Sequence, residues 1–593
     1  MVCYSDGLRG CTYSHSLYPA FGYSFAGYHG FLCCRKFSGL FFLFETISKQ
    51  TGIAMKYLAF LAMNLLFVQC DYAQSLPVVQ ANSKNVSVRD GQVFQKGVWN
   101  LSPEVKPDVY QALEPMVEKR ITFYTDIDSV SFDVTPGKTY DFLIVLNKKD
   151  TCYTRISTIR TASQTALDSK ADKLMEPTLL QQDFKVFRES LEKHHAGIYT
   201  YRSKQVLDRF MDSCYLALNR PMTTLEFGKP ILQVISALQD GHTRSNLPAL
   251  LMKHYTDNEK VFPIHPYFMK NKAYVLCGEG LPAGTEIIQI DGRTIPEIRD
   301  KIYTYLPSDG SITANKRQRL NDGAFPIFYH WVYGNQERFE VQYKGQNGTI
   351  ETIKIGAVGT KNIVCAYEKQ RNNTKALQLI WLNASTALLQ VRTFDESRIE
   401  REKIDFGGFL DSAFTAINKR KIKNLIIDVR DNGGGADDYG ALLYSYLSQK
   451  PFRYFLSKAS NTHTVKLDEN PLLGPQKPQP NSFKGQVSIL TNGYSFSTTA
   501  DFCATARHNK RATFIGEETG GGYYGNTSGG RTEVVLPNSQ IVVQIPLYKY
   551  LNAVRKAEHS DRGIIPDYEV FASIEDILQQ KDVELALALG LMR

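Results

Sequence analysis

The sequence predicts a multidomain α+β protein: a β-sandwich-like N-terminal module, a small helical domain, a second β-rich block and a C-terminal α/β core. Three changes of pattern carry this prediction. Apolar and polar residues alternate in stretches of 76–162, apolar residues recur at helical spacing within 177–250, and from residue 377 short apolar runs alternate with helical stretches. With 593 residues the chain is too long for one ordinary domain, which agrees with several units.

The composition argues against several classes of function. Apolar residues make up 43% of the chain and aromatic residues 12%, which is ample for packed cores. The formal net charge of +9 is small for this length and no run of Lys and Arg stands out, so nothing indicates nucleic-acid binding. The ten cysteines show no CxxC or Cys/His spacing, so we expect neither a zinc site nor a disulfide framework.

An export signal is predicted over residues 55–75. A single lysine precedes an apolar run that is too short to span a bilayer, and small residues follow it, as in a signal peptide. Because a signal peptide should be N-terminal, we interpret residues 1–54 as a non-native leader; the alternative is a real N-terminal extension. Cys70 is a candidate lipid-attachment residue. We expect an exported protein in the periplasm or at the outer membrane, with an extracellular location as the alternative.

Residues 76–162 are predicted to form the β-sandwich-like module. Apolar and polar residues alternate over 130–134, and Pro136 and Gly137 mark a turn. Nothing in this module looks catalytic, so a binding or packing role is the default. The polar stretch 163–177 that follows is a predicted linker.

The helical domain is predicted over 177–250. Apolar residues recur at helical spacing after Asp183, which is placed to cap the first helix. Two further helices are predicted over 204–218 and 223–238. The β-rich block 260–358 comes next, with a strand at 287–290 that ends in an Asp-Gly turn.

The α/β core is predicted over 377–593. Its apolar runs are short, and each is followed by a helical stretch, as buried strands of an α/β sheet are. The predicted strands are "ALLQVR", "NLIIDVR", "VSILTN" and "ATFIGE".

The stretch "NGYSFSTTADF" offers two candidate nucleophiles, Ser495 and Ser497, on a turn between a strand and a helix that starts at Thr498. Thr498 and Asp501 fit a capping box, which leaves Ser497 just outside the first helical turn. The free N–H groups and the positive end of the helix dipole then lie beside its hydroxyl, where an oxyanion would develop. The alternative is that both serines only form the turn.

Two further stretches offer a base and an oxyanion-binding loop. In "LQDGHT", His242 follows a helix and a glycine, and a neutral imidazole can take a proton near pH 7. In "IIDVRDNGGG", three glycines after a buried strand allow backbone N–H groups to point into a cleft. Taken alone, an exposed histidine and a flexible turn would explain these two stretches. A second glycine loop, "FIGEETGGGYYG", could line the same cleft.

Together these stretches resemble peptidase family S41, the tail-specific or C-terminal-processing proteases and their tricorn-like relatives. "DGHT", "IIDVRDNGGG", "NGYSFSTTADF", "FIGEETGG" and "GIIPDYEV" occur in the family's order, roughly from residue 183 to residue 570. The resemblance implies a PDZ-like insertion over 260–358 and a crotonase/ClpP-like fold for the core. It implies a serine endopeptidase that acts on peptide tails or partly unfolded proteins through an acyl-enzyme, without metal or cofactor.

The resemblance also selects the reacting residues. In the family the nucleophile precedes the glycine of the "GE" pair by a fixed interval, and counting nineteen back from Gly516 gives Ser497. Many members have a lysine base in a "T-x-G-K" stretch, but glycine occupies that position, Gly522, here. The tricorn-like branch has a histidine in the "DGHT"-like stretch, so we expect a Ser–His mechanism with His242 as base.

The supporting residues are less determined. The tricorn-like branch supplies a carboxylate before the "GxxPD" stretch, where Asp561 and Glu558 both qualify and Asp561 is preferred; Asp240 is a third option. The implied oxyanion donors are the backbone N–H groups of Thr498 and Gly434. The rival function is a non-catalytic peptide- or glycan-binding protein that retains the fold. The sequence does not indicate the oligomeric state.

Overall fold

The computed structural model describes residues 174–592, except 364, 366–373 and 556–559, together with eight strands between residues 86 and 158. The expected leader, the signal peptide, Cys70 and Glu558 lie outside the described residues. The chain divides into two compact units, Met1–Leu167 and Asp168–Arg593, and each is described by itself. In the part of the chain that is described, no helix combines the length and the apolar character needed to cross a membrane.

The first unit contains antiparallel strand pairs, as the alternating pattern predicts. The pairs are β1 (Val86–Arg89) with β2 (Gln92–Gln95), β3 (Asp108–Gln111) with β6 (Thr139–Phe142), β4 (Arg120–Tyr124) with β5 (Ser129–Asp133), and β7 (Val145–Lys149) with β8 (Cys152–Thr158). The β character of this module is therefore confirmed, while its sandwich-like packing stays a prediction.

The second unit begins with the predicted helical domain. Its helices are α4 (Pro177–His194), α5 (Lys204–Leu216), α6 (Thr224–Leu238) and α7 (Ala249–Asn258). The prediction that Asp183 caps the first helix is wrong, because α4 already starts at Pro177, a residue that suits a first helical turn. Asp183 is instead fully buried, and its carboxylate accepts the backbone N–H groups of Asn538 at 2.9 Å and Ser539 at 2.7 Å.

The β-rich block that follows has a six-stranded sheet in the order β11-β12-β13-β15-β16, with β14 on β13. Its strands are β11 (Ile264–Met269), β12 (Lys272–Gly278), β13 (Glu286–Ile290), β14 (Arg293–Thr294), β15 (Arg338–Lys344) and β16 (Ile350–Gly356), and its helices are α8 (Ile295–Tyr303), α9 (Ala314–Arg319) and α10 (Phe325–Tyr333). Asp291 and Gly292 connect β13 to β14 with φ values of 49° and 74°, so the predicted strand and turn are confirmed. The PDZ-like character of the block stays a prediction.

A disulfide joins Cys277 to Cys365 across 88 residues of sequence. The expectation of no disulfide is therefore wrong for this pair. The two cysteines lie too far apart in the chain for their spacing to signal a bond, and only the folded block brings their Cα atoms to 5.6 Å.

The C-terminal core has a six-stranded sheet in the order β18-β19-β20-β24-β25-β28. Its strands are β18 (Leu377–Trp381), β19 (Thr386–Val391), β20 (Asn424–Asp428), β24 (Gln486–Thr491), β25 (Thr513–Gly516) and β28 (Tyr568–Glu569). All neighbours are parallel except β18 and β19, and the four apolar runs singled out in the sequence are strands β19, β20, β24 and β25.

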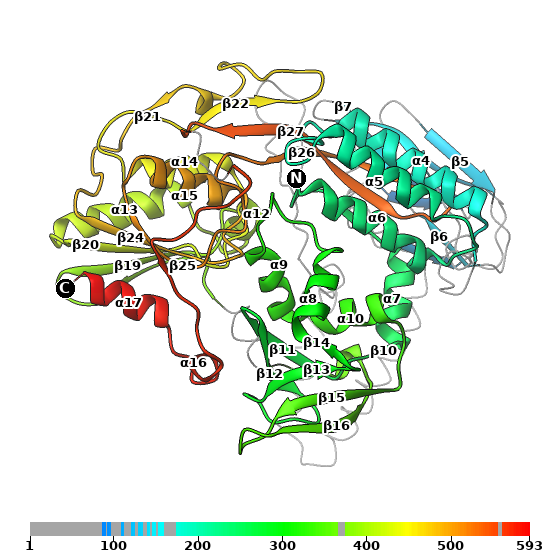
Figure 1. Cartoon of the computed structure of the whole chain (residues 1–593). Helices are drawn as coiled ribbons and strands as arrows, with labels where there is room; N and C mark the ends of the chain where they lie inside the picture. The colour runs from blue at the N-terminus through cyan, green and yellow to red at the C-terminus, as the bar shows by residue number, and fades with distance from the viewer. Residues whose placement is uncertain are drawn as a thin grey trace, which may run out of the picture. The chain divides into compact units, whose positions relative to one another are not determined.

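Helices cover both faces of this sheet (Figure 1). Helices α13 (Phe406–Lys419), α14 (Asp437–Ser445) and α15 (Thr498–His508) pack on the face that carries Leu389 and Ile427. Helix α17 (Val583–Leu591) packs on the opposite face, against Leu388 and Ile426. Strands buried on both faces explain why these runs are continuously apolar.

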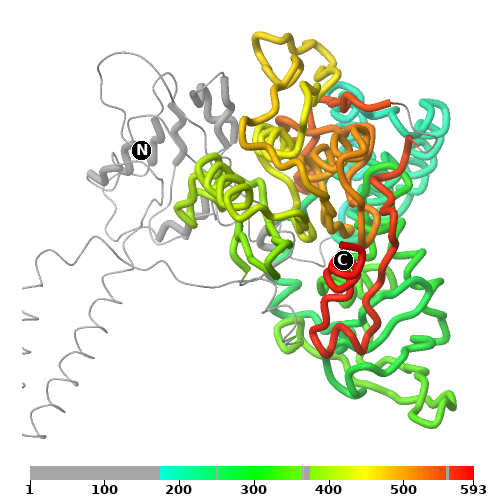
Figure 2. Tube along the Cα trace, turned by 90° about the vertical axis from the view of Figure 1, so that its left-hand side faces the viewer, coloured from blue at the N-terminus to red at the C-terminus, as the bar shows by residue number. Residues whose placement is uncertain are grey.

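A second sheet connects the helical domain to the core, and no local sequence signal predicts it. Strand β27 (Val542–Asn552) pairs with β22 (Phe455–Ala459), with β26 (Thr527–Val535) and with the short strand β9 (Arg244–Asn246). Residues 177–258, coloured from cyan to green, and the orange segment around β26 therefore lie side by side in both views (Figures 1 and 2). Because β9 begins two residues after His242, this pairing fixes the position of the histidine loop.

Candidate active site

Ser497 stands at the turn between β24 and α15, as the N-cap residue of the helix. Its backbone angles, φ 55° and ψ −130°, are rare for a residue with a side chain and cost about 1–3 kcal/mol. Its hydroxyl makes no capping hydrogen bond, so it is available for another partner. Strain of this kind at a serine on a strand-to-helix turn points to function.

The neighbouring Ser495 has a structural role. Its buried hydroxyl donates to the carbonyl of Val429 at 2.9 Å and accepts the backbone N–H of Asn492 at 3.2 Å. The predicted capping box of Thr498 and Asp501 is wrong. Asp501 is buried and holds the side-chain amides of two C-terminal asparagines, Asn526 at 3.1 Å and Asn552 at 2.9 Å.

The structure brings His242 to Ser497, with His242 Nε2 lying 3.1 Å from Ser497 Oγ. The imidazole stacks on the Phe496 ring, with 4.5 Å between ring centroids and 28° between planes. A Cβ on Gly241 would lie 2.7 Å from the same ring, so only glycine fits before the histidine. These contacts hold the imidazole in the plane from which it reaches the hydroxyl.

His242 is neutral near pH 7. Burial lowers the pKa of its imidazole to about 4; the negative charge of Asp240 opposes this shift and the positive charge of Arg244 adds to it. If Nε2 accepts the serine proton, Nδ1 must carry the other one. Nδ1 is buried and has no hydrogen-bond partner within the described residues, and Asp240 Oδ1 lies 3.9 Å away.

Asp240 is held in a buried network that the sequence did not reveal. Gly197 N–H donates to His195 Nδ1 at 3.0 Å, so the proton of that ring is on Nε2, which donates to Asp240 Oδ2 at 2.7 Å. Thr243 Oγ1 donates to the same oxygen at 2.5 Å, and the backbone N–H of His242 donates to Oδ1 at 3.0 Å. Burial alone would raise the pKa of Asp240, but these bonds and the neighbouring histidines lower it, so the carboxylate stays charged.

Of the two carboxylates preferred from the sequence, only Asp561 is described, and it does not hydrogen-bond to the histidine. Glu558 lies outside the described residues. The backbone carbonyl of Asp561 accepts the Ser311 N–H at 2.8 Å, and the carboxylate of Asp561 does not accept a hydrogen bond from His242 Nδ1. The carboxylate that the geometry does place beside the imidazole is Asp240, the third option.

Asp309 is a further buried carboxylate of the site that sequence analysis missed. Its Oδ1 accepts the Gly241 N–H at 2.7 Å and its Oδ2 accepts the Gly522 N–H at 3.3 Å. Burial and the charge of Asp240 raise its pKa to about 7. Asp309 thus ties the histidine loop to the glycine loop, with the N–H groups of Gly241 and Gly522 as its two backbone donors.

The two oxyanion donors expected from the sequence differ in availability. No hydrogen bond within the described residues uses the backbone N–H of Thr498, as expected for the first residue of a helix. The N–H of Gly434 donates to the side chain of Asn432 at 3.0 Å. A Cβ on Gly434 would lie 2.7 Å from Ser497 Cβ and 3.0 Å from Thr498 N, so this glycine keeps open the space beside the hydroxyl.

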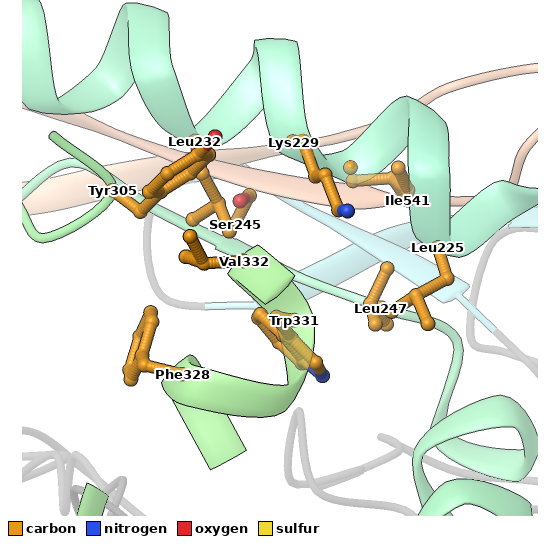
Figure 3. A pocket seen from close by; sticks show the side chains of 11 residues that line it. Leu225, Lys229, Leu232, Ser245, Leu247, Tyr305, Phe328, Trp331, Val332 and Ile541 are labelled. Carbon is orange, nitrogen blue, oxygen red and sulfur yellow. The ribbon is translucent and has the colours of Figure 1, made fainter. Parts of the chain in front are cut away.

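Two other features of the second unit resemble sites. The donor atoms of Asp240, His242 and Asp309 lie within 4.8 Å of one another, but each already holds an N–H or O–H group, which fits a hydrogen-bonded network better than a metal centre. The pocket in Figure 3 lies between α6 and α10 and is lined largely by apolar side chains, without Ser497 or His242. It is separate from the catalytic geometry.

Comparison with known proteins gives one family match and several structures of similar fold. The model of peptidase family S41 matches residues 385–570. The structure of mature CPAF complexed with lactacystin is similar to this chain in fold, with 15% sequence identity, a TM-score of 0.50, and coverage of 70% of this chain and 97% of that one. The photosystem II D1 C-terminal processing protease matches at 14% identity and TM-score 0.34, covering 66% of this chain and 93% of that one. The tricorn protease matches at 14% identity and TM-score 0.31, covering 77% of this chain and 39% of that one. No curated protein sequence matches the chain.

Proposed function

The chain belongs to peptidase family S41 and is a serine peptidase, and from this premise we propose that Ser497 is its nucleophile and His242 its general base. The observation that carries the proposal is the 3.1 Å contact between Ser497 Oγ and His242 Nε2, two atoms whose residues are 255 apart in the sequence. The hydroxyl of a serine with a strained backbone, a neutral and partly buried imidazole and a helix N-terminus converge at this point.

The proposed reaction follows the serine-protease scheme. Ser497 Oγ attacks the peptide carbonyl while its proton moves to His242 Nε2, which later returns the proton to the leaving amine. Water then hydrolyses the acyl-enzyme with His242 again acting as base. The oxyanion lies next to the Thr498 N–H, in the space that Gly434 keeps open.

Asp240 is the carboxylate that we assign to the imidazolium. It lies 3.9 Å from Nδ1, is only 5% exposed at its side chain, and is held by His195 and Thr243, so it cannot turn away when the ring becomes charged. A carboxylate in this place stabilises the imidazolium without itself taking the proton. For this role we prefer Asp240 to Asp561, while the alternative Glu558 stays a prediction from the sequence.

The cellular location and the class of substrate are proposed mainly from the sequence. We propose that the protein is exported and that its substrates are peptide tails or partly unfolded proteins, held by strand addition in the 260–358 block. The disulfide Cys277–Cys365 supports export, because such bonds persist mainly in oxidising compartments.

The test compares the full chain with a Ser497→Ala variant on a peptide library and with a serine-reactive fluorophosphonate. We expect hydrolysis and covalent labelling by the wild type, and neither by the variant, with both melting at similar temperatures. The rival, a peptide- or glycan-binding protein without activity, would bind the library without cleaving it. Equal labelling of Ser497→Ala would overturn the assignment.

A further inference from the structure

Two arginines converge on the reacting pair from different parts of the chain. Arg244 follows His242 by two residues on β9, where Ser245 lines the pocket between α6 and α10 (Figure 3). Because successive side chains on a strand point to opposite faces, Arg244 faces away from that pocket, toward the side of His242. Its guanidinium is close enough to the imidazole for its charge to lower the pKa of His242.

Arg319 arrives from α9, which packs on the nucleophile turn. Asn315 of this helix donates its side-chain amide to the carbonyl of Gly493 at 2.9 Å, just before Ser497. Residues four apart lie on one face of a helix, so Arg319 is on the same face as Asn315. Its charge also lowers the pKa of His242.

Neither guanidinium has an ion pair or hydrogen bond within the described residues, although both arginines are half-buried. Burial and the charges of Arg319 and Arg531 lower the pKa of Arg244 to about 10. The two carboxylates nearby, Asp240 and Asp309, are already occupied by donors of the histidine and glycine loops. Charges that are partly withdrawn from water are stabilised by pairing, so these two cations leave room for an anion that a ligand can supply.

We propose that Arg244 and Arg319 form a carboxylate-binding subsite next to the Ser497–His242 pair, so that the peptidase prefers substrates with an acidic group close to the cleaved bond. This inference rests on the proposed function, since it assigns the substrate class of that same site. The carboxylate can come from an Asp or Glu side chain or from the C-terminus of the peptide. A guanidinium binds either one through paired N–H donors.

The experiment uses matched peptides and the full-length protein. One series exchanges Glu for the isosteric Gln at each position near the cleaved bond, and a second exchanges a free C-terminal carboxylate for an amide. We expect at least one exchange to lower kcat/KM by about tenfold or more, which is ~1.4 kcal/mol. An effect confined to the first series identifies a side-chain carboxylate, and one confined to the second identifies the C-terminus.

Two variants, Arg244→Gln and Arg319→Gln, should each bring the acidic-to-neutral ratio toward one. The control Arg188→Gln removes the same charge on α4, where Arg188 is already paired with Asp212 at 2.5 Å, and should keep the wild-type ratio. If a Gln variant does not fold, as judged by its melting transition, the corresponding Arg→Lys variant is measured in its place. The acidic-to-neutral ratio of kcat/KM in this variant and in the wild type then decides. A ratio near one in the wild type, or an unchanged ratio in both folded Arg variants, overturns the subsite.

Failure of the subsite and failure of the proposed function give different results. If Ser497 is labelled and peptides are cleaved without regard to charge, only the subsite is lost. If Ser497→Ala cleaves as well as the wild type, the catalytic assignment itself is lost.

Discussion

Replacing Asp240 by Asn tests whether the buried network supports the general base. The substitution keeps the shape of the side chain but removes its charge, 3.9 Å from His242 Nδ1. At that separation two unit charges interact by ~4 kcal/mol for an effective dielectric constant of about 20. This is the upper limit of what Asp240 contributes when the imidazole becomes charged in the transition state, and it corresponds to about a thousandfold in rate.

We expect Asp240→Asn to lower kcat/KM by about a hundredfold to a thousandfold. The assay measures peptide hydrolysis and, independently, the rate of fluorophosphonate labelling of Ser497, because both require the imidazole as base. The control is Asp212→Asn on α5, which removes a carboxylate that is 57% exposed at its side chain. It should leave both rates at the wild-type value.

Part of any loss could come from unfolding, since Asp240 also holds His195 and Thr243. An asparagine oxygen can still accept from His195, so the variant should remain folded with a lower melting temperature. Rates are therefore compared well below the melting transition of each protein. Rates within threefold of the wild type in folded Asp240→Asn would refute the assignment and return the role to a C-terminal carboxylate.

Three further predictions address other parts of the site and the fold. The pKa of His242 is lowered to about 4, below the value near 6.5 of an unfolded chain, so kcat/KM should fall only as the pH drops toward 4. Between these two pH values the unfolded state binds the proton more tightly than the folded state, so His242 should cost up to about 3 kcal/mol of folding free energy as the pH falls from 6.5 to 4. Urea titrations of the wild type and of His242→Gln should therefore differ in this pH range. Gly434→Ala should lower kcat/KM by about a hundredfold or more, because the new Cβ fills the space beside Ser497. The control is Gly292→Ala, which also strains a backbone of positive φ (74°) but has no atom within 4 Å of the new Cβ. It should lower only the melting temperature. Cys277→Ser opens a link across 88 residues and should cost about 4–5 kcal/mol in the chain-entropy account, measured by denaturant unfolding, with no change in the labelling rate of Ser497 if the site is intact.

The local parts of this fold were predictable from sequence. Buried strands of the core are continuous apolar runs, and the loops after them carry Gly434 and Ser497, so strand positions and loop residues follow from short-range patterns. The same patterns placed the start of α15 at Thr498 correctly. Ser497 was preferred over Ser495 only through the family resemblance, and the structure gives an independent reason: the Ser495 hydroxyl is already used within the turn.

The long-range parts were not predictable, because nothing in a single sequence marks which distant residues meet. The pairing of β9 with β27, which positions His242, joins short segments without a distinctive pattern. His195 and Asp309 are isolated polar residues whose burial depends on the whole fold. For Asp183 a local pattern was present but misleading. An aspartate is suited to capping a helix, and it serves equally well as a buried acceptor for a distant loop.

The site combines several features that are unfavourable for stability, and together they argue for preorganisation. Ser497 has a strained backbone, Asp240 and Asp309 are buried carboxylates, and the partly buried His242 resists protonation. Each persists because its surroundings leave no alternative: α15 and the glycine loop fix the serine, and β9 on β27 fixes the histidine. A hydroxyl and an imidazole already at 3.1 Å need no rearrangement to begin the reaction, so the energy of folding, rather than that of substrate binding, assembles the reacting pair.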